Sequence, residues 1–366
     1  MDKQKRRLLV VSNMYPSRKY PHYGVFVKHS AEILQNCGYT VDVVSMRKTT
    51  GKLRKLFAYA VFYSAVLLKG LFGRYNAVYA HYASHTALPL LILKKFKKLP
   101  LIMNVHGNDI VPETEADEKF LGLVKRVLCK AELIICPSLY FKGVVTENYN
   151  VPDNKAVVYP SGGVDTEVFA PMSKQDAAKQ LGLDENYNYW AYVSRIEEKK
   201  GWDLFLKSGA KLLKDRPGTK LIVVGDGDQA QDFAQLAESL GLSERIVKFN
   251  LLAQTEIVKI FNLAQLFIFP TYRKSESLGL VGLEAMACGA VVLLPDMYGP
   301  ASYGSDGENA FVFTSGDCDS LTEAIERALE TDTETIKINA RKTAQLYNHQ
   351  NCDRILKEIF DSFFEN

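Results

Sequence analysis

The stretch LFIFPTYRKSESLGLVGLEAMACG, residues 266–289, joins an apolar run, a polar loop and a second apolar run with helical spacing. The run LFIFP predicts a strand that ends at Pro270, and LGLVGLEAMACG predicts a helix with Gly289 suited to its C-cap. Strand, loop and helix in this order form the repeating unit of α/β proteins. Two carboxylates interrupt the apolar pattern, because Glu276 falls in the loop and Glu284 about one turn inside the helix.

The same alternation of short apolar runs with helical patterns continues along the chain in both directions. Strands are predicted in the first half at RLLVVSN, TVDVVS, NAVYAH, PLIMNVHG, LIICPS and AVVYPSG, and in the second half at YWAYVSRI, KLIVVGDG, RIVKFN, LFIFP, AVVLLP and AFVFT. Two such series predict an α/β fold of two Rossmann-like domains that face each other. The polar stretch GGVDTEVFAPMSKQD separates them, so we place the domains at residues 1–168 and 169–346.

Length and composition agree with this division. A chain of 366 residues is too long for one ordinary core, and its 47% hydrophobic and 24% charged residues are typical of a soluble globular protein. The opening MDKQKRRLLVVSN has no small-residue cleavage site after its basic run, and the six cysteines form no C-x-x-C pair. We therefore expect reduced thiols and a cytoplasmic location.

Basic residues are concentrated in the first half of the chain. Between Asp42 and Asp109 there is no Asp or Glu, but there are eleven Lys and Arg. The segment GKLRKLFAYAVFYSAVLLKGLFGR has an apolar, aromatic centre and basic ends, and it is too short and interrupted for a confident transmembrane span. It predicts a membrane-surface helix attracted to anionic lipid. The alternative is a buried helix with a solvated basic rim, and no recognised motif favours nucleic acid.

The residues after the predicted strands are the first candidates for a site, because ligands of doubly wound sheets bind at the carboxyl ends of strands. In SRIEEKKGWD, Arg195 and Lys200 could reach a diphosphate from one rim, or could simply be solvated. In VHGND, His106 could bind a substrate oxygen or a backbone carbonyl. In the loop after the first strand, Gly24 allows a close backbone approach to a ligand.

The loop of the opening stretch predicts an anion site. The backbone amides of Ser277, Leu278, Gly279 and Leu280 would be the unpaired donors at the helix N-terminus, where a phosphate binds readily. Glu276 and Glu284 would bracket that phosphate and bind neutral hydroxyls, such as a ribose diol on one side and a sugar on the other. The alternative is that the charge of Glu276 only interacts favourably with the helix dipole and that Glu284 is an exposed helical residue.

Two other patterns predict no site. Asp226 and Asp228 in VVGDGDQ have the D-x-D spacing of some metal sites, but they lie in a glycine turn directly after a strand, where turn geometry explains them. No G-x-G-x-x-G follows the first strand, which disfavours a dinucleotide dehydrogenase.

Taken together, these strand ends resemble glycosyltransferase family 4, the retaining glycosyltransferases with the GT-B fold. Glu276 and Glu284 resemble the family's E-x7-E pattern, SRIEEKKGWD its Arg-x4-Lys-Gly diphosphate motif, and YPSGGVDTEVFAP the segment that closes its first domain. The resemblance covers essentially the whole chain. It implies a deep cleft between the domains and a C-terminal helix, residues 347–366, that crosses back to the first domain.

The resemblance also implies roles for the residues that match. Glu284 would hold the nucleotide ribose and Glu276 the transferred sugar, while His106 would bind that sugar near the reacting carbon. Arg195 and Lys200 would neutralise the leaving diphosphate without a metal or other cofactor, and the amides of residues 277–280 would bind the distal phosphate. Gly24 would approach from the other domain. Its preceding residue is Tyr23, where many members have a second glycine, so the role of that loop is less well supported.

The resulting prediction is a glycosyltransferase that moves a sugar from a nucleotide diphosphate sugar, with uridine as the expected base, to a glycan or lipid-linked acceptor. We expect it to act in cell-surface polysaccharide synthesis, peripherally at the inner face of the membrane. The alternatives are a nucleotide-sugar epimerase on the same scaffold and a non-enzymatic sugar-binding module. Backbone near residues 251–253 is expected to contact the base.

Overall fold

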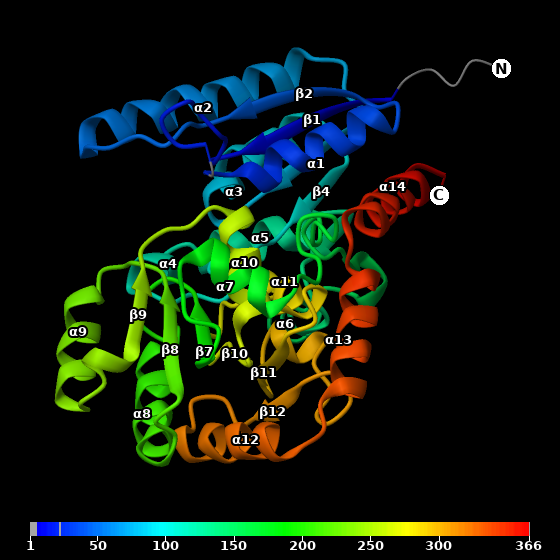
Figure 1. The fold of residues 1–366 in the computed structure, drawn as a ribbon. Helices are drawn as coiled ribbons and strands as arrows, with labels where there is room; N and C mark the ends of the chain where they lie inside the picture. The colour runs from blue at the N-terminus through cyan, green and yellow to red at the C-terminus, as the bar shows by residue number, and fades with distance from the viewer. Residues whose placement is uncertain (1–5, 22, 366) are drawn as a thin grey trace. The chain divides into compact units, whose positions relative to one another are not determined.

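We describe residues 6–21 and 23–365 of a computed structural model, so the first five residues of the N-terminal basic run lie outside the description. The chain divides into two units, residues 1–162 with 350–366 and residues 163–349. Each unit has its own parallel sheet of six strands (Figure 1).

The first unit contains the sheet order β2-β1-β3-β4-β5-β6. Its strands are β1 (Arg7–Ser12), β2 (Thr40–Ser45), β3 (Ala77–His81), β4 (Leu101–Asn104), β5 (Leu133–Cys136) and β6 (Ala156–Val158). Its helices are α1 (Val25–Asn36), α2 (Lys52–Phe72), α3 (Ala83–Phe96), α4 (Glu115–Glu118), α5 (Leu121–Lys130), α6 (Leu139–Asn148), the 3-10 helix η1 (Asp153–Lys155) and α14 (His349–Glu365). The central strands are buried on both faces, as expected for a parallel sheet between layers of helices.

The second unit contains the sheet order β12-β11-β10-β7-β8-β9. Its strands are β7 (Asn188–Val193), β8 (Thr219–Val224), β9 (Ile246–Phe249), β10 (Leu266–Ile268), β11 (Val291–Pro295) and β12 (Phe311–Phe313). Its helices are α7 (Lys174–Leu181), α8 (Trp202–Leu212), α9 (Ala230–Ser239), α10 (Gln254–Leu263), α11 (Leu280–Ala287), α12 (Cys318–Glu330) and α13 (Glu334–Leu346), with 3-10 turns η2 (Leu213–Asp215), η3 (Ser243–Arg245) and η4 (Pro300–Ser302).

The C-terminal helix belongs to the first unit (Figure 1). Leu356 and Phe360 of α14 are fully buried in the same core cluster as Leu8 and Val10 of β1. The phenol of Tyr39 donates a 2.8 Å hydrogen bond to Asp361. Burial of these apolar side chains, worth about 1.5–3 kcal/mol each, holds the end of the chain against the first sheet.

The junction between the units differs from the expected boundary at residue 168. The division falls after Gly162, because Val164 exchanges backbone hydrogen bonds with the end of α13 and Phe169 packs on Phe261 of the second core. The sequence places residues 163–168 in the first domain because the first series of strands ends there and a polar stretch with a proline follows. Their pairing with residues 347–349 is a long-range contact that composition does not reveal.

Among the described residues, α2 is the one helix long and apolar enough to cross a membrane, and 17% of its apolar window is buried. The sequence analysis judged this segment too short and interrupted for a confident transmembrane span. That judgement of its length was wrong, since α2 runs unbroken for 21 residues. One face of α2 nevertheless packs on protein: Phe62 and Val66 join the first core, and a methyl group on Gly70 would lie 2.6 Å from Leu93 of α3.

Candidate active site

The second sheet reverses its strand order between β7 and β10, which are neighbours although they are far apart in sequence. Ligands of open α/β sheets bind at such a switch point, beyond the carboxyl ends of the strands. The loop after β7 carries Arg195 and Lys200, and the loop after β10 carries Glu276. The fold therefore brings two of the sequence-predicted segments together at the favoured edge of this sheet.

Lys200 and Glu276 form an ion pair in which Nζ lies 2.6 Å from Oε2. The two side chains are only 10% and 14% exposed. Gly201, the N-cap of α8, fixes the approach of the two loops, because a Cβ at this position would lie 1.9 Å from the Pro270 carbonyl oxygen. The backbones of the two loops are thus in close contact at Gly201, and only glycine permits this contact.

The Glu276 carboxylate stays ionised in this setting. Burial alone would raise the pKa of Glu276, but the charge and hydrogen bond of Lys200 outweigh burial and lower the pKa below its ordinary value. Arg273 and the Thr271 hydroxyl, 3.4 Å from Oε2, add to the lowering of the pKa. A fixed anion and a fixed cation are therefore available side by side.

The two arginines near this pair have different settings. The side chain of Arg195 is 57% exposed and its Nη1 lies 2.6 Å from Oε1 of Glu197. Arg273, which the sequence interpretation did not single out, lies 3.7 Å from the same carboxylate and donates a 2.9 Å bond to Ser275. Its position three residues before Glu276 in a strand-end loop was the signal that could have found it.

The loop before α11 and the N-terminus of that helix contain the residues for which the sequence predicts an anion site. Gly279 is the N-cap of α11 in the left-handed conformation, and within the part of the chain described here the amides of Ser277, Leu278 and Gly279 donate to no protein acceptor. Two neighbours hold the turn in place: the Tyr303 hydroxyl donates a 2.8 Å hydrogen bond to the Gly279 carbonyl, and Gly299 packs against the 276–278 backbone. Free amides with a positive helix end attract an anion.

Glu284 lies inside α11 and differs in its electrostatics from Glu276. Among residues 6–21 and 23–365 its carboxylate has no hydrogen-bond or ion-pair partner. Burial raises the pKa of Glu284 to about 7. A mostly buried carboxylate without a protein partner is suited to accept hydrogen bonds from ligand hydroxyls, because those bonds would compensate for its lost hydration.

In the first unit, Gly24 caps α1 with a φ of 73°. A Cβ there would lie 2.7 Å from the carbonyl carbon of Met14 and 2.8 Å from the amide nitrogen of Tyr15. The glycine thus lets the start of α1 close against the loop that follows β1. Phe26, two residues later, packs its ring 4.4 Å from the ring of His106.

His106 follows β4 and is paired with a second histidine that the sequence interpretation missed. Nδ1 of His81, the last residue of β3, lies 3.1 Å from Nε2 of His106, and the two rings are stacked. Burial lowers the pKa of His106 to about 3, and burial with the neighbouring His106 lowers the pKa of His81 as well. Both rings are neutral near pH 7, and the other nitrogen of His81 is buried with no partner in the described chain.

The VHGND motif is explained by Asp109, which sequence reasoning also passed over. One carboxylate oxygen accepts from the amides of His106 and Gly107 at 3.0 and 2.8 Å, and the other accepts from Ala83 at 2.9 Å. Asp109 therefore ties the loop after β4 to the start of α3. It positions the His106 backbone.

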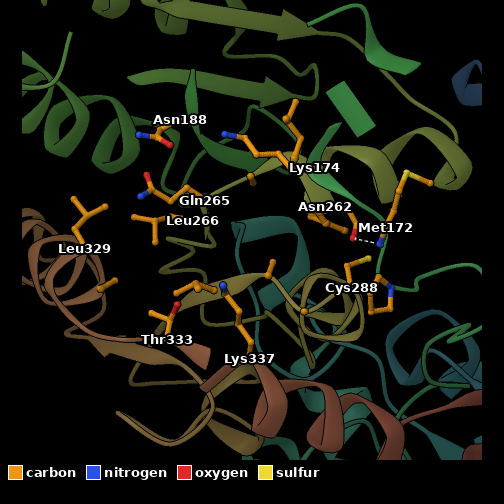
Figure 2. Close-up of a pocket in the computed structure, with 18 of the residues that line it drawn as sticks. Met172, Lys174, Asn188, Asn262, Gln265, Leu266, Cys288, Leu329, Thr333 and Lys337 are labelled. Carbon is orange, nitrogen blue, oxygen red and sulfur yellow. Dashed lines mark hydrogen bonds between the residues drawn. The ribbon is translucent and has the colours of Figure 1, made fainter. Parts of the chain in front are cut away.

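The opposite edge of the second sheet contains a separate cavity of about 430 Å3 (Figure 2). Asn188, Gln265 and Lys174 line one side of it, and Thr333 and Lys337 the other (Figure 2). The side-chain amides that line the cavity already serve the fold, because Asn262 accepts from the Met172 amide and Gln265 accepts from the Trp190 indole.

The D-x-D pattern lies in a turn, where Asp226 accepts a hydrogen bond from the Gly227 amide. The described residues contain no cluster of three His, Cys, Asp or Glu placed to hold a metal.

Comparison with known families matches almost the whole chain. The model of Glycosyltransferase Family 4 matches residues 7–168, and the model of Glycosyl transferases group 1 matches residues 173–344. A D-inositol 3-phosphate glycosyltransferase of Mycobacterium ulcerans is 31% identical over 71% of this chain and 57% of its own. The D-inositol 3-phosphate glycosyltransferase of Segniliparus rotundus is 29% identical over 60% of this chain and 51% of its own. The chain thus spans a little over half the length of these curated relatives.

Solved structures share the fold at low identity. Sucrose-phosphate synthase of Thermosynechococcus elongatus superposes with a TM-score of 0.80 at 20% identity, covering 99% of this chain and 100% of its own. A glycosyltransferase of Rickettsia africae gives 0.78 at 17% identity over 99% and 100%. HepE of Anabaena, in complex with UDP and glucose, gives 0.72 at 20% identity over 98% and 100%. The match is to the GT-B fold.

Proposed function

This chain belongs to glycosyltransferase family 4, and we propose that it moves a sugar, with retention, from a uridine diphosphate sugar to a glycan or lipid-linked acceptor in cell-surface polysaccharide synthesis. The observation that carries the proposal is the site beyond β7 and β10. It combines a buried cation with a carboxylate at 2.6 Å, free helix amides and an unpartnered carboxylate. A nucleoside diphosphate sugar has a matching series of groups: sugar hydroxyls, two phosphates and a ribose diol.

The proposed roles follow from the charges of these groups. Negative charge develops on the diphosphate as the sugar leaves, and preorganised cations and amides stabilise that charge where it forms. Lys200 and the α11 amides supply this stabilisation, with Arg195 as an exposed second cation. Glu276 binds hydroxyls of the transferred sugar, Glu284 binds the ribose, and His106 of the first unit binds the donor sugar near the reacting carbon.

The first experiment is thermal unfolding of the full chain with UDP, GDP or ADP, each with EDTA and again with magnesium. Ligand at 100 times its dissociation constant stabilises by about 2.7 kcal/mol, or roughly 2–4 °C in a protein of this size. A shift with UDP that survives EDTA is expected. UDP is tested first because HepE of Anabaena was solved with it. The absence of a shift with every nucleotide would remove the main support for the proposal.

Product analysis separates the proposed reaction from its alternatives. Incubation with UDP-glucose and an acceptor should release UDP and form a glycoside with the donor's anomeric configuration. Conversion of the donor sugar without UDP release would identify an epimerase, and binding without turnover would identify a sugar-binding module. Glu276→Gln is the control, because it keeps the size of the side chain and removes its charge.

We further propose that the first unit binds the anionic inner surface of the membrane through α2, which keeps the protein cytoplasmic and peripheral. Phe57 and Phe72 are 72% and 80% exposed, and Leu53 is 83% exposed. Lys52, Arg54 and Lys55 lie beside them. Exposed apolar side chains flanked by cations are typical of a helix that lies in the membrane interface, where each basic residue adds about 1 kcal/mol.

A groove of about 720 Å3 lies between α3 and α5 of the same unit. Its apolar lining is Leu88, Leu91, Ile92 and Leu123, and its rim is Lys94, Lys95, Lys125, Arg126 and Lys130. The amine of Lys94 lies 2.7 Å from Glu132, so this lysine also serves the fold. An apolar floor with a basic rim suits an anionic amphiphile.

Sedimentation with anionic phosphatidylglycerol vesicles tests the membrane proposal. Neutralising Lys52, Arg54, Lys55 and Lys95 together should release the protein, and Phe57→Ser with Phe72→Ser should weaken binding in a salt-independent way. Leu346→Ser, at a residue 68% exposed in the second unit, is the matched control. Unchanged binding of both the charge-neutralised variant and the Phe57 and Phe72 variant would overturn the proposal.

A further inference from the structure

Tyr82, the residue between β3 and α3, has a strained backbone. It is the N-cap of α3 with a φ of 68° and a ψ of 84°, in the left-handed region that a bulky side chain rarely adopts. Backbone strain persists only where the surrounding structure holds it, and such residues cluster at functional sites. A tyrosine at this position indicates that its side chain makes contacts that outweigh the strain.

Hydrogen bonds hold this backbone on both sides. The Tyr82 amide donates to the Asn104 carbonyl of β4 at 3.1 Å. The Tyr82 carbonyl accepts from the Thr86 hydroxyl at 2.9 Å and from the Thr86 amide at 3.4 Å. Because the backbone is fixed, the direction in which the tyrosine side chain leaves it is fixed as well.

The side chain of Tyr82 contacts the loop after β4 at two points. The centre of its ring lies 5.7 Å from the centre of the His106 ring, with an angle of 13° between the two planes. Its hydroxyl donates a 2.5 Å hydrogen bond to Oδ1 of Asn108. One side chain thus restrains both the ring proposed to bind the sugar and the residue two positions beyond it.

The next residue of α3 holds the same loop one position further along. The Ala83 amide donates at 2.9 Å to the carboxylate of Asp109. The side-chain amide of Asn108 donates at 3.4 Å to Asp117, which belongs to the capping box of α4. The start of α3 therefore supports the loop at two successive residues, and Asn108 extends this support to α4.

The surroundings of Tyr82 differ from those of a tyrosine that only fills the core. Tyr82 is partly exposed, whereas Tyr79 of the same strand is fully buried. The Tyr82 hydroxyl binds the side chain of Asn108 in a loop. Its contacts therefore serve the loop that carries His106 and not the sheet beneath it.

We propose that Tyr82 is a positioning residue for His106 in the transfer of the sugar. The stacked ring and the bond to Asn108 restrict the loop after β4, so that the His106 ring is held in the orientation in which it meets the donor sugar. A group that is held in place before the reaction loses less entropy on reaching the transition state. The inference rests on the proposed function, because it takes His106 to contact that sugar.

Hydrolysis of UDP-glucose by the full chain, followed as released UDP, tests this role. Tyr82→Phe keeps the ring and removes the hydroxyl, so it should lower kcat about tenfold with less than about a twofold change in KM. Tyr82→Leu removes the ring as well and should lower kcat further. Wild-type kcat in both variants would overturn the proposal.

The matched control is Tyr75→Phe, two residues before β3 begins. Tyr75 is also partly exposed, and its hydroxyl donates a 2.8 Å hydrogen bond to the Asp42 carboxylate. This variant therefore loses a comparable bond in the same unit, away from the loop of His106, and should change kcat by about twofold or less. An equal loss of kcat in Tyr75→Phe and Tyr82→Phe would count against a positioning role.

A double-mutant cycle shows whether the hydroxyl acts through Asn108. Asn108→Ala should lower kcat to a similar extent as Tyr82→Phe, and the two changes together should lower it little further, because both remove the same bond. If the two losses instead multiply, the residues act independently and the proposed link is wrong.

Nitrogen-15 NMR separates this inference from the proposed function. The ring-nitrogen signals of His106, assigned by their absence in His106→Gln, should shift in Tyr82→Phe without any donor present and stay in place in Tyr75→Phe. A wild type that releases no UDP would count against the proposed function. Unchanged His106 signals in Tyr82→Phe would count against the positioning role.

Discussion

Nζ of Lys200 and Oε2 of Glu276 lie 2.6 Å apart, although the two residues belong to loops that follow different strands. Each charge compensates for the burial of the other. The site therefore contains one nearly buried ion pair in which the lysine can face a phosphate and the carboxylate a hydroxyl. Changes at either residue are expected to act on both.

Removing one member of the pair should have different effects from removing both. Lys200→Met leaves the buried Glu276 carboxylate without its counter-charge and should lower the free energy of unfolding by about 3–5 kcal/mol. Lys200→Met with Glu276→Gln removes both charges and should recover most of that loss. Urea unfolding of the four proteins gives the coupling free energy. Strictly additive effects would show that the pair is not coupled.

Glu276 and Glu284 should differ in their effects on catalysis. Glu276→Ala should lower turnover more than UDP affinity, because we expect it to contact the reacting sugar, whereas Glu284→Ala should weaken UDP binding. Steady-state kinetics with UDP titration measures both quantities. An equal loss of UDP affinity in the two variants would contradict the separate roles assigned to Glu276 and Glu284.

Glu284 should also make stability depend on pH. Burial raises its pKa from 4.5 to about 7 in the folded protein, so between these values the folded state binds more protons than the unfolded state. The free energy of unfolding that the protonated Glu284 side chain contributes is present below about pH 4.5. It is therefore lost as pH rises from about 4.5 to 7. Glu284→Gln should flatten this part of the curve and be more stable than the wild type at pH 8 by about 2–3 kcal/mol. Urea unfolding across this range checks the sign, and a variant with the wild-type slope would contradict it.

The same titration should govern nucleotide affinity. Ribose hydroxyls donate to the ionised carboxylate, so UDP binding lowers the pKa of Glu284 and becomes tighter as pH rises toward 7. Affinity should increase by up to about tenfold per pH unit below 7 in the wild type and much less in Glu284→Gln. Calorimetry in two buffers of different ionisation enthalpy would show proton release with the wild type only.

Much of the architecture could be predicted from the sequence because it depends on local pattern. Every predicted strand is present, the two series form separate parallel sheets, and the family identification is confirmed. Apolar runs such as Leu8 to Val11 have no polar residue to mark a solvent face, which is the pattern of a strand buried on both sides. The order of strands and the pairing of Val164 with the end of α13 depend on contacts between distant segments, so they could not be read from local pattern.

The positions of His106 and Glu276 in loops that follow strands could be predicted from the sequence, because the strands themselves are marked by local pattern. Partners supplied by other segments could not. His81 reads in the sequence as the end of one more apolar strand, and only the pairing of β3 with β4 places it beside His106. Asp109 reads as a loop acid, yet it binds the amides of both adjoining segments. The catalytic and binding roles of the site residues stay predictions until the variants are measured.

His81 should fix the proton position of His106. The buried Nε2 of His81 has no partner in the described chain, and an unpaired nitrogen lone pair costs less than an unpaired N–H. We therefore expect Nδ1–H of His81 to donate to Nε2 of His106, which leaves the His106 proton on Nδ1. Nitrogen-15 NMR of the labelled protein reports both tautomers. His81→Phe should lower kcat about tenfold with little change in KM for the donor, and His81→Asn, which keeps a donor near the Nδ1 position, should restore part of kcat; two variants with equal kcat would contradict this role.

Gly201 should be intolerant of a side chain because it joins the two loops of the site. Its φ of 76° already disfavours other residues, and an added Cβ would lie 1.9 Å from the Pro270 carbonyl oxygen, which is backbone and cannot rotate away. Gly182 is the matched control: its φ is 68°, it also flanks a helix, and its Cβ position is open. Gly182→Ala should cost about 1 kcal/mol for the left-handed conformation alone. Gly201→Ala should cost several times more and weaken UDP binding, because Lys200 and the loop of Glu276 are forced apart; equal melting temperatures and UDP affinities in the two variants would show that this contact does not hold the site.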